Sequence, residues 1–226
     1  MGKAIIIHNG ILSDPPPDDA KFHVYREKRF FKGESFPLVG MLGEFFKNQM
    51  ELVDAVPFLK EEFPNLKVAF VGDTSDSVLV QPLKNKIRRL GLEGDFIFTG
   101  RVPRERIPDV FFDFDLSVST FRNEGYGLAH LESLAAGTPV VAYNEGGVVD
   151  ILRGEDVGIL VDRGPEEFAA AVACLLRDHE SRFVMGRRGY DLVQKRFSRT
   201  QMARKYIELF QQLTQSPEQG NLLRAK

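Results

Sequence analysis

The sequence has no tryptophan, one cysteine and only four histidines in 226 residues. A single cysteine excludes an intrachain disulfide. Because Cys174 falls in an apolar helical pattern, we expect it in the core rather than in a nucleophilic site. The four histidines have no metal-ligand spacing with one another or with carboxylates, so no metal site is predicted. This cysteine usage is typical of a reducing compartment, and we expect a cytoplasmic protein.

The sequence also lacks a large net charge of either sign and a long apolar run. Thirty Lys and Arg oppose 32 Asp and Glu, which gives a net charge of −2, so general attraction to nucleic acid or an anionic membrane is not expected. The apolar runs are shorter than the ~20 residues of a bilayer span. The first ten residues lack the sustained apolar core of a signal peptide. We therefore expect no transmembrane segment and no nucleic-acid partner.

Several catalytic fingerprints are absent. No GxGxxG follows the first apolar run, and Gly125 and Gly127 lack the third glycine, since position 130 is His. No Walker lysine loop and no Ser-His-Asp or Cys-His arrangement is visible. Glu124 and Glu132 do not form a glycosidase pair, because one loop and one helix do not flank a bond as hydrolysis requires.

What the sequence does contain is a repeated alternation of strand, loop and helix. The predicted strands are 36–42, 66–71, 96–99, 116–119, 140–143 and 158–161. The predicted helices are 47–62, 79–90, 104–112, one after Gly127, 149–152, 166–176, 181–195 and 199–213. This order predicts an α/β fold: a single Rossmann-like domain over 1–213, with about six parallel strands and helices on both faces. Pro57 should bend or end its helix, and the polar tail 214–226 should fray.

Glycine and charged residues cluster directly after the predicted strands, at 43–47, 72–73, 100–101, 123–127 and 145–147. Ligands of parallel sheets bind beyond the carboxyl ends of the strands, so these loops should form one ligand-binding rim. Lys47 stands at a helix start, where the macrodipole disfavours a cation unless an anion binds there. A phosphate contact and a solvated lysine are equally compatible with that position. Gly43 would allow the same loop to approach the anion closely.

The stretch from Phe121 to Tyr143 carries the most specific chemistry. A helix should begin near Gly127, whose backbone can turn sharply and whose first free N–H groups make an anion site. Glu132 lies in this helix among small apolar neighbours, and a charge there needs a strong hydrogen-bonding partner. Ligand hydroxyls and a basic side chain are both candidate partners. His130 lies on the polar face of the same helix, and we expect it at the surface.

The residues EGYGLAHLESLAAGTPVVAYNEGG at 124–147 resemble the signature of the retaining group 1 glycosyltransferases of the B-type two-domain fold. That signature has two glutamates separated by seven residues, then a Gly-Thr-Pro-Val strand and a Gly-Gly loop. Further similar segments are Asn9-Gly10 (the interdomain link), LVGML…KNQ (the phosphate loop), VAFVGD, FTGRVPRERIPDVF, GILVD and the Phe-Ser at Phe197. The resemblance covers nearly all of the chain and implies the C-terminal, nucleotide-sugar-binding domain of this fold.

The resemblance implies a role for several of these residues. Glu132 would hold the ribose hydroxyls. The backbone amides of Gly127 and Leu128 would cap the diphosphate, and Lys47 would neutralise charge that develops on it. No metal ion, no covalent nucleophile and no cofactor besides the donor substrate is expected.

The remaining implied contacts are with the sugar and the base. Glu124, with the amides near Gly125 and Tyr126, would position the sugar. The base would meet the loop of Thr99, Gly100, Arg101 and Val102.

The activity implied is retaining transfer of a hexose from a UDP- or GDP-sugar to a glycan or lipid acceptor. The alternatives are a non-catalytic nucleotide- or partner-binding module of the same fold and half of a nucleotide-sugar epimerase. One departure motivates the binding module: the family usually has an arginine six positions before the phosphate lysine, and here that position is Met41. Either Arg101 or Arg122 substitutes for it, or donor binding is weakened.

A second departure is the lack of the family's N-terminal, acceptor-binding domain. The chain resembles the donor half, with an interdomain link at 1–20 and a final helix at 199–213 that would pack back against the other domain. Alone, that helix would expose an apolar stripe prone to association, formed by Met202, Tyr206, Leu209 and Leu213. The full enzyme could also touch a membrane peripherally.

Overall fold

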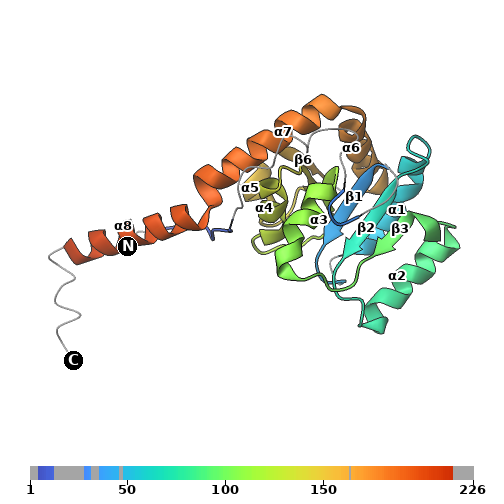
Figure 1. The fold of residues 1–226 in the computed structure, drawn as a ribbon, viewed down its shortest axis with the longest axis horizontal. Helices are drawn as coiled ribbons and strands as arrows, with labels where there is room; N and C mark the ends of the chain where they lie inside the picture. The colour runs from blue at the N-terminus through green and yellow to red at the C-terminus, as the bar shows by residue number, and fades with distance from the viewer. Residues whose placement is uncertain (1–4, 13–27, 32–35, 46–47, 163, 216–226) are drawn as a thin grey trace.

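The computed structural model describes residues 5–12, 28–31, 36–45, 48–162 and 164–215. Six parallel strands form one sheet of order β3-β2-β1-β4-β5-β6 (Figure 1). The strands are β1 (Leu38–Leu42), β2 (Lys67–Val71), β3 (Phe96–Phe98), β4 (Leu116–Ser119), β5 (Val140–Tyr143) and β6 (Gly158–Val161). The predicted parallel α/β fold is therefore confirmed. Because the strand order reverses direction between β1 and β4, the topological switch point lies between these two strands.

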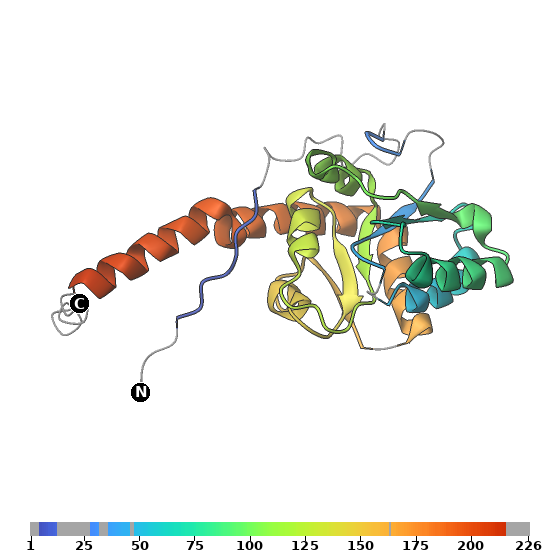
Figure 2. The same ribbon diagram turned by 90° about the horizontal axis from the view of Figure 1, so that it is seen from below.

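Helices cover both faces of the sheet (Figure 2). They are α1 (Gln49–Lys60), α2 (Ser77–Arg89), α3 (Ile107–Asp113), α4 (Leu128–Ala135), α5 (Val148–Leu152), α6 (Pro165–Arg177), α7 (His179–Leu192) and α8 (Arg199–Gln215), with the short turns η2 (Glu93–Asp95), η3 (Arg104–Arg106) and η4 (Val193–Phe197). Successive strand side chains point to opposite faces. Val39 and Met41 pack into the cluster that contains α1, α2 and α6, whereas Leu38 packs against α3. Helices α4 and α5 cover β5 on the α3 face.

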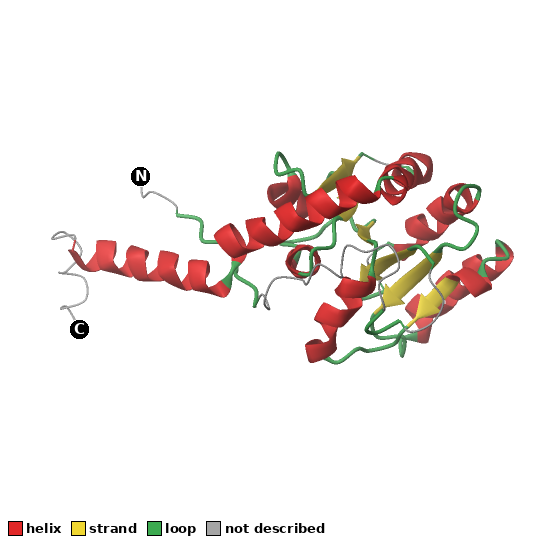
Figure 3. Cartoon of the chain, turned by 45° about the horizontal axis from the view of Figure 1, so that its top comes forward, coloured by secondary structure: helices red, strands yellow, loops and turns green. Residues whose placement is uncertain are grey.

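Helix α8 extends away from the sheet and its covering helices (Figure 3). At its base, Ile11 forms a parallel bridge with Ser198, with hydrogen bonds from Ile11 N to Phe197 O (2.8 Å) and from Arg199 N to Ile11 O (3.0 Å). Of the expected stripe, Tyr206 and Leu213 are exposed, and Met202 and Leu209 are half-buried; Ile207 and Phe210 add exposed apolar surface. None of the described helices combines the length and the apolar character that crossing a bilayer would take.

Two local expectations were wrong, and one was decided in part. Of the two outcomes expected at Pro57, an end is excluded: helix α1 continues to Lys60, as the predicted range 47–62 requires, because its packed residues outweigh the one hydrogen bond that proline removes. Cys174 is exposed, since α6 turns Phe168, Val172, Ala173, Leu175 and Leu176 inward and leaves Cys174 on its outer side. His130 is buried, at 4% exposure, because α4 is packed between α3 on one side and α7 and η4 on the other.

Gly40 occupies the middle of β1 where a side chain has no room. A Cβ there would lie 1.9 Å from Cζ of Phe114, a fully buried ring in contact with the rings of Phe31 and Phe111. Gly40→Ala is expected to lower the free energy of unfolding by about 1–3 kcal/mol, the usual cost of overpacking, measured by urea denaturation. Gly94→Ala is the control, because a Cβ at that position meets open space. Equal stability of the two variants would contradict the tight β1–Phe114 packing.

Candidate functional site

The loops that follow β1, β2 and β4 meet at the switch point. Gly43 N donates a hydrogen bond to Val71 O (2.9 Å), and a Cβ on Gly72 would lie 2.2 Å from Gly43 O. Across the switch point, Thr120 Oγ1 donates to Asn48 O (2.8 Å), and Asn48 Nδ2 donates to Thr120 O (3.3 Å). The loop after β1 is therefore fixed to its neighbours on both sides. Lys47 itself lies outside the described residues, and its phosphate role stays a prediction.

The rim continues towards both edges of the sheet. On the β3 side, Arg101 pairs with Asp73 (2.8 Å), and hydrogen bonds from Ser75 and Arg101 lower the pKa of Asp73 to about 2. On the β5 side, Gly147 N donates to Glu124 O (2.8 Å). The structure thus brings the described parts of all five predicted loop clusters to the carboxyl ends of the strands.

The loop after β4 lies directly against the Gly146-Gly147 turn. A Cβ on Gly146 would lie 2.7 Å from Glu124 O, and one on Gly147 would lie 2.6 Å from Gly125 O. Glycine is needed at both positions because any side chain there would collide with this backbone. The half-buried Glu124 is therefore held in a loop of defined shape.

Helix α4 begins where the sequence predicted. Its N-cap is Gly127, with a left-handed φ of 85° that favours glycine. Gly127 carries no side chain that could cap the helix, and the first N–H groups of a helix have no acceptor within it. These N–H groups, including that of Leu128, and the positive end of the helix dipole suit an anion.

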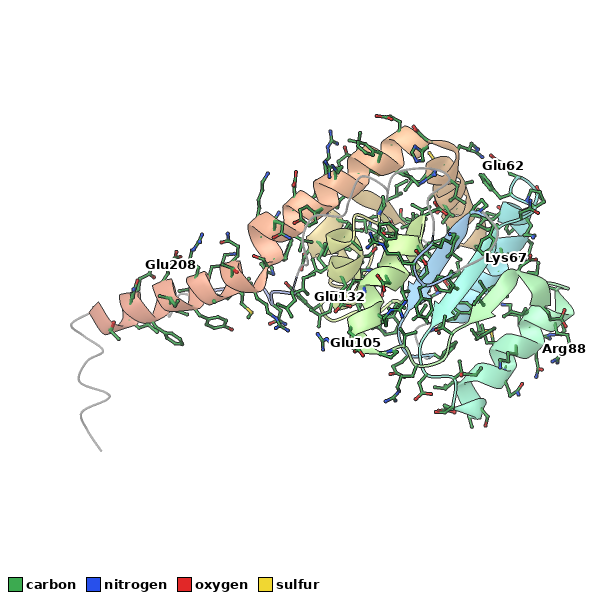
Figure 4. All side chains as sticks on the ribbon, viewed as in Figure 1. Glu62, Lys67, Arg88, Glu105, Glu132 and Glu208 are labelled. Atoms are coloured by element: carbon green, nitrogen blue, oxygen red, sulfur yellow. The ribbon has the colours of Figure 1, made fainter. Side chains whose placement is uncertain are left out.

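Glu132 lies one turn further along α4 and is half-buried (Figure 4). Burial raises the pKa of its carboxyl, and the charge of nearby Arg104 partly opposes this rise. No hydrogen bond or ion pair reaches the carboxylate from the part of the chain that the structure describes. Of the two partners considered for Glu132, the basic one is represented here by Arg104, which acts through its charge without an ion pair, and the ligand hydroxyls stay a prediction. Sequence reasoning missed Arg104, which comes from η3.

The predicted base-contacting loop, Thr99 to Val102, lies beside the loop after β2. Thr99 N donates to Phe70 O (3.1 Å), which extends the pairing of β3 with β2. Gly100 has a φ of 69°, and a Cβ there would lie 3.8 Å from Thr74 Oγ1. The loop is therefore on the same rim as the α4 start, on the other side of the switch point.

The structure describes Met41 and both arginines that were proposed to replace the family arginine. Met41 is buried on β1. Arg101 is engaged by Asp73, and Arg122, directly after β4, donates from Nη2 to Glu51 Oε1 on α1. Arg122 is the nearer of the two to the switch point, since it follows Thr120 by two residues.

The Arg122–Glu51 pair belongs to a small network that sequence reasoning missed. Burial alone would raise the pKa of Glu51, but the nearby polar groups of Tyr143 and Asn48 and the charge of Arg122 hold it below its ordinary value. Burial and the Glu51 carboxylate raise the pKa of Tyr143. The network therefore keeps a negative Glu51 and a positive Arg122 beside the switch point. No group of three or more metal-ligating residues suited to an ion occurs among the described residues.

Comparisons with known proteins agree with this architecture. Residues 25–192 match the family described as "Glycosyl transferases group 1". A D-inositol 3-phosphate glycosyltransferase from Corynebacterium urealyticum is 30% identical over 193 residues, which cover 82% of this chain and 45% of that protein.

Two solved structures share the fold. Alr3699/HepE from Anabaena, in complex with UDP, has a TM-score of 0.71 at 25% identity, over 78% of this chain and 49% of that one. The C-terminal domain of LpcC from Francisella tularensis has a TM-score of 0.68 at 22% identity, over 81% of this chain and 96% of that domain. The chain spans about half the length of the curated relatives it matches. On this evidence the chain belongs to the group 1 glycosyl transferases.

Proposed function

We propose that the rim binds the nucleotide-sugar donor of a retaining glycosyltransferase. The observation that carries the proposal is Glu132: its half-buried carboxylate has a raised pKa and no ion pair in the described chain, and it follows a helix start with free N–H groups. Such a carboxylate gains most from neutral hydroxyl donors, and a ribose supplies two of them. The diphosphate then lies at the amides of Gly127 and Leu128.

The transfer reaction makes specific electrostatic demands on this site. Negative charge grows on the diphosphate as the bond to the sugar breaks, and the positive end of α4 stabilises that charge where it develops. Lys47 supplies a second positive group. Glu124 and the backbone near Gly125 and Tyr126 position the hexose. The loop from 99 to 102 receives the base.

The donor is a UDP- or GDP-sugar, and UDP is supported by the HepE complex. Because the matched relatives are about twice as long as this chain, we place the glycan or lipid acceptor on a further domain, with α8 packed against it. The resulting enzyme works in the cytoplasm.

A thermal-shift panel with UDP, GDP and ADP tests donor binding by the intact chain. At 100 times its dissociation constant, a true ligand should raise the free energy of unfolding by about 2.7 kcal/mol. At least one nucleoside diphosphate is expected to shift the midpoint, and inorganic phosphate at the same concentration is expected to shift it less. No shift with any of the three would count against the proposal.

The buried Met41 favours one second candidate, a nucleotide-binding module without turnover. Sugar transfer by a protein that joins this chain to an acceptor domain distinguishes the two. Transfer that depends on Glu124 supports the enzyme. Tight nucleotide binding without any transfer supports the module.

Arg122 rather than Arg101 is expected to replace the family arginine. Arg122→Gln should weaken UDP binding about tenfold, the effect of losing one charged hydrogen bond of ~1.5 kcal/mol. Arg101→Gln should change binding less than threefold, because Arg101 is 80% exposed and paired with Asp73. Calorimetric titration of both variants compares them directly, and a larger loss in Arg101→Gln would reverse the assignment.

A further inference from the structure

Tyr126 joins the candidate site to a segment more than a hundred residues away in sequence. Its backbone lies in the loop between Glu124 and Gly127, but its hydroxyl donates to the main-chain carbonyl of Asn9 (2.9 Å). The ring of His8 stacks on the Tyr126 ring at a centroid distance of 6.1 Å. The phenol therefore bridges the predicted sugar-binding loop and the segment at 8–11.

That segment is in turn fixed to the base of α8. The rings of His8 and Phe197 meet in a T-shaped arrangement at a centroid distance of 5.5 Å, and Ile11 pairs with Ser198 through main-chain hydrogen bonds. Gly10 leaves no space between the chains, since a Cβ there would lie 2.5 Å from Ser198 O. A displacement at 8–11 must therefore shift either Tyr126 or the start of α8.

The backbone of Tyr126 is held as closely as its hydroxyl. A Cβ on Gly147 would lie 2.8 Å from the Tyr126 Cα, so the turn after β5 covers this backbone closely. The next residue, Gly127, is the N-cap of α4, whose first N–H groups have no acceptor within the helix. The position of the Tyr126 backbone consequently decides where the start of α4 points.

We propose that Tyr126 is a positioning residue whose hydroxyl couples nucleotide binding at the α4 start to the segment 8–11 and the base of α8. The inference rests on the proposed function, because it requires a nucleotide at the rim. Coupling between two sites is reciprocal: if a bound nucleotide holds the segment, the held segment strengthens nucleotide binding by the same factor. One neutral hydrogen bond sets that factor at a few-fold to about tenfold.

Hydrogen exchange of the full chain, with and without UDP, tests this coupling in Tyr126→Phe. In the wild type, UDP should slow exchange in the peptide that covers residues 5–12. Tyr126→Phe keeps the ring but loses the hydroxyl, so UDP should bind a few-fold to tenfold more weakly. At saturating UDP, the added protection at 5–12 should be lost in this variant.

Two control variants separate coupling from general destabilisation. Asn9→Ala retains the accepting main-chain carbonyl and should respond as the wild type does. Tyr190→Phe removes a half-buried hydroxyl from α7, away from the rim, and should also leave the response unchanged.

Each remaining outcome is decisive. Unchanged protection at 5–12 in Tyr126→Phe, or no protection in a wild type that binds UDP, would overturn the coupling and leave the proposed function standing. A wild type that binds neither UDP nor GDP would overturn the proposed function, and the coupling with it.

Discussion

Replacing Glu132 with alanine should reduce the affinity for the preferred nucleoside diphosphate at least tenfold, and up to about a hundredfold. The carboxylate is expected to accept hydrogen bonds from the ribose hydroxyls, and a hydrogen bond to a charged group contributes about 1.5–3 kcal/mol. Calorimetric titration with UDP, GDP and ADP measures the loss. The matched control is Glu105→Ala, an exposed glutamate in the adjacent η3 turn (Figure 4), which should bind as the wild type does. Full affinity in Glu132→Ala would remove the ribose role.

Removing the charge of Glu132 with the near-isosteric Glu132→Gln should not destabilise the nucleotide-free protein. Burial raises the pKa of Glu132 above its ordinary value, so its ionisation opposes folding once the pH exceeds the ordinary value for a glutamate. Glu132→Gln should therefore be at least as stable as the wild type at pH 7, and this advantage should disappear at pH 4. Thermal unfolding at the two pH values measures it. A variant less stable than the wild type at pH 7 would indicate a structural ion pair instead.

The second large effect is expected at Asp113, far from the rim. Its side chain is fully buried at the end of α3. Its carboxylate accepts hydrogen bonds from three successive main-chain N–H groups, of Arg29 (2.7 Å), Phe30 (2.6 Å) and Phe31 (2.7 Å). Asp113→Ala would leave three main-chain N–H groups without this acceptor, that of Phe31 in a buried position, and is expected to cost about 3–5 kcal/mol of unfolding free energy.

Far-UV circular dichroism in urea is a suitable measurement for Asp113, because the chain has no tryptophan to report by fluorescence. Asp109→Ala is the control: Asp109 lies one turn earlier in α3 and pairs with Arg106 at the surface (2.8 Å), which is worth less than ~1 kcal/mol. If Asp113→Ala does not fold, Asp113→Asn, which keeps the size and one acceptor oxygen, should fold with an intermediate loss. Wild-type stability in either Asp113 variant would contradict the anchoring role.

The sequence predicted the sheet well because its strands are short apolar runs between turn residues. The predicted ranges 116–119, 140–143 and 158–161 coincide with β4, β5 and β6. The start of α4 at Gly127 could also be predicted, because glycine marks such boundaries. What the pattern could not reveal is which neighbour covers a helix face, and for this reason Cys174 and His130 were misplaced.

Asp113 was missed for a related reason. An aspartate at a helix end normally faces solvent, and here its partners come from a segment more than eighty residues earlier. The residues of the candidate site likewise divide into those that local sequence signals predict and those that depend on tertiary packing. Local signals placed Glu132 beside a helix start, whereas the contacts of Arg122 with Glu51 and of Tyr126 with Asn9 depend on tertiary packing.

The central claim is that a diphosphate binds at the start of α4. It is tested most directly by titrating the isotopically labelled chain with UDP and GDP and following each backbone amide by NMR. The account predicts the largest shifts at Gly127 and Leu128, with no change at Lys67, which begins β2 and so lies at the amino ends of the strands, opposite the rim (Figure 4). Saturable binding that leaves the amides of Gly127 and Leu128 unmoved would contradict it.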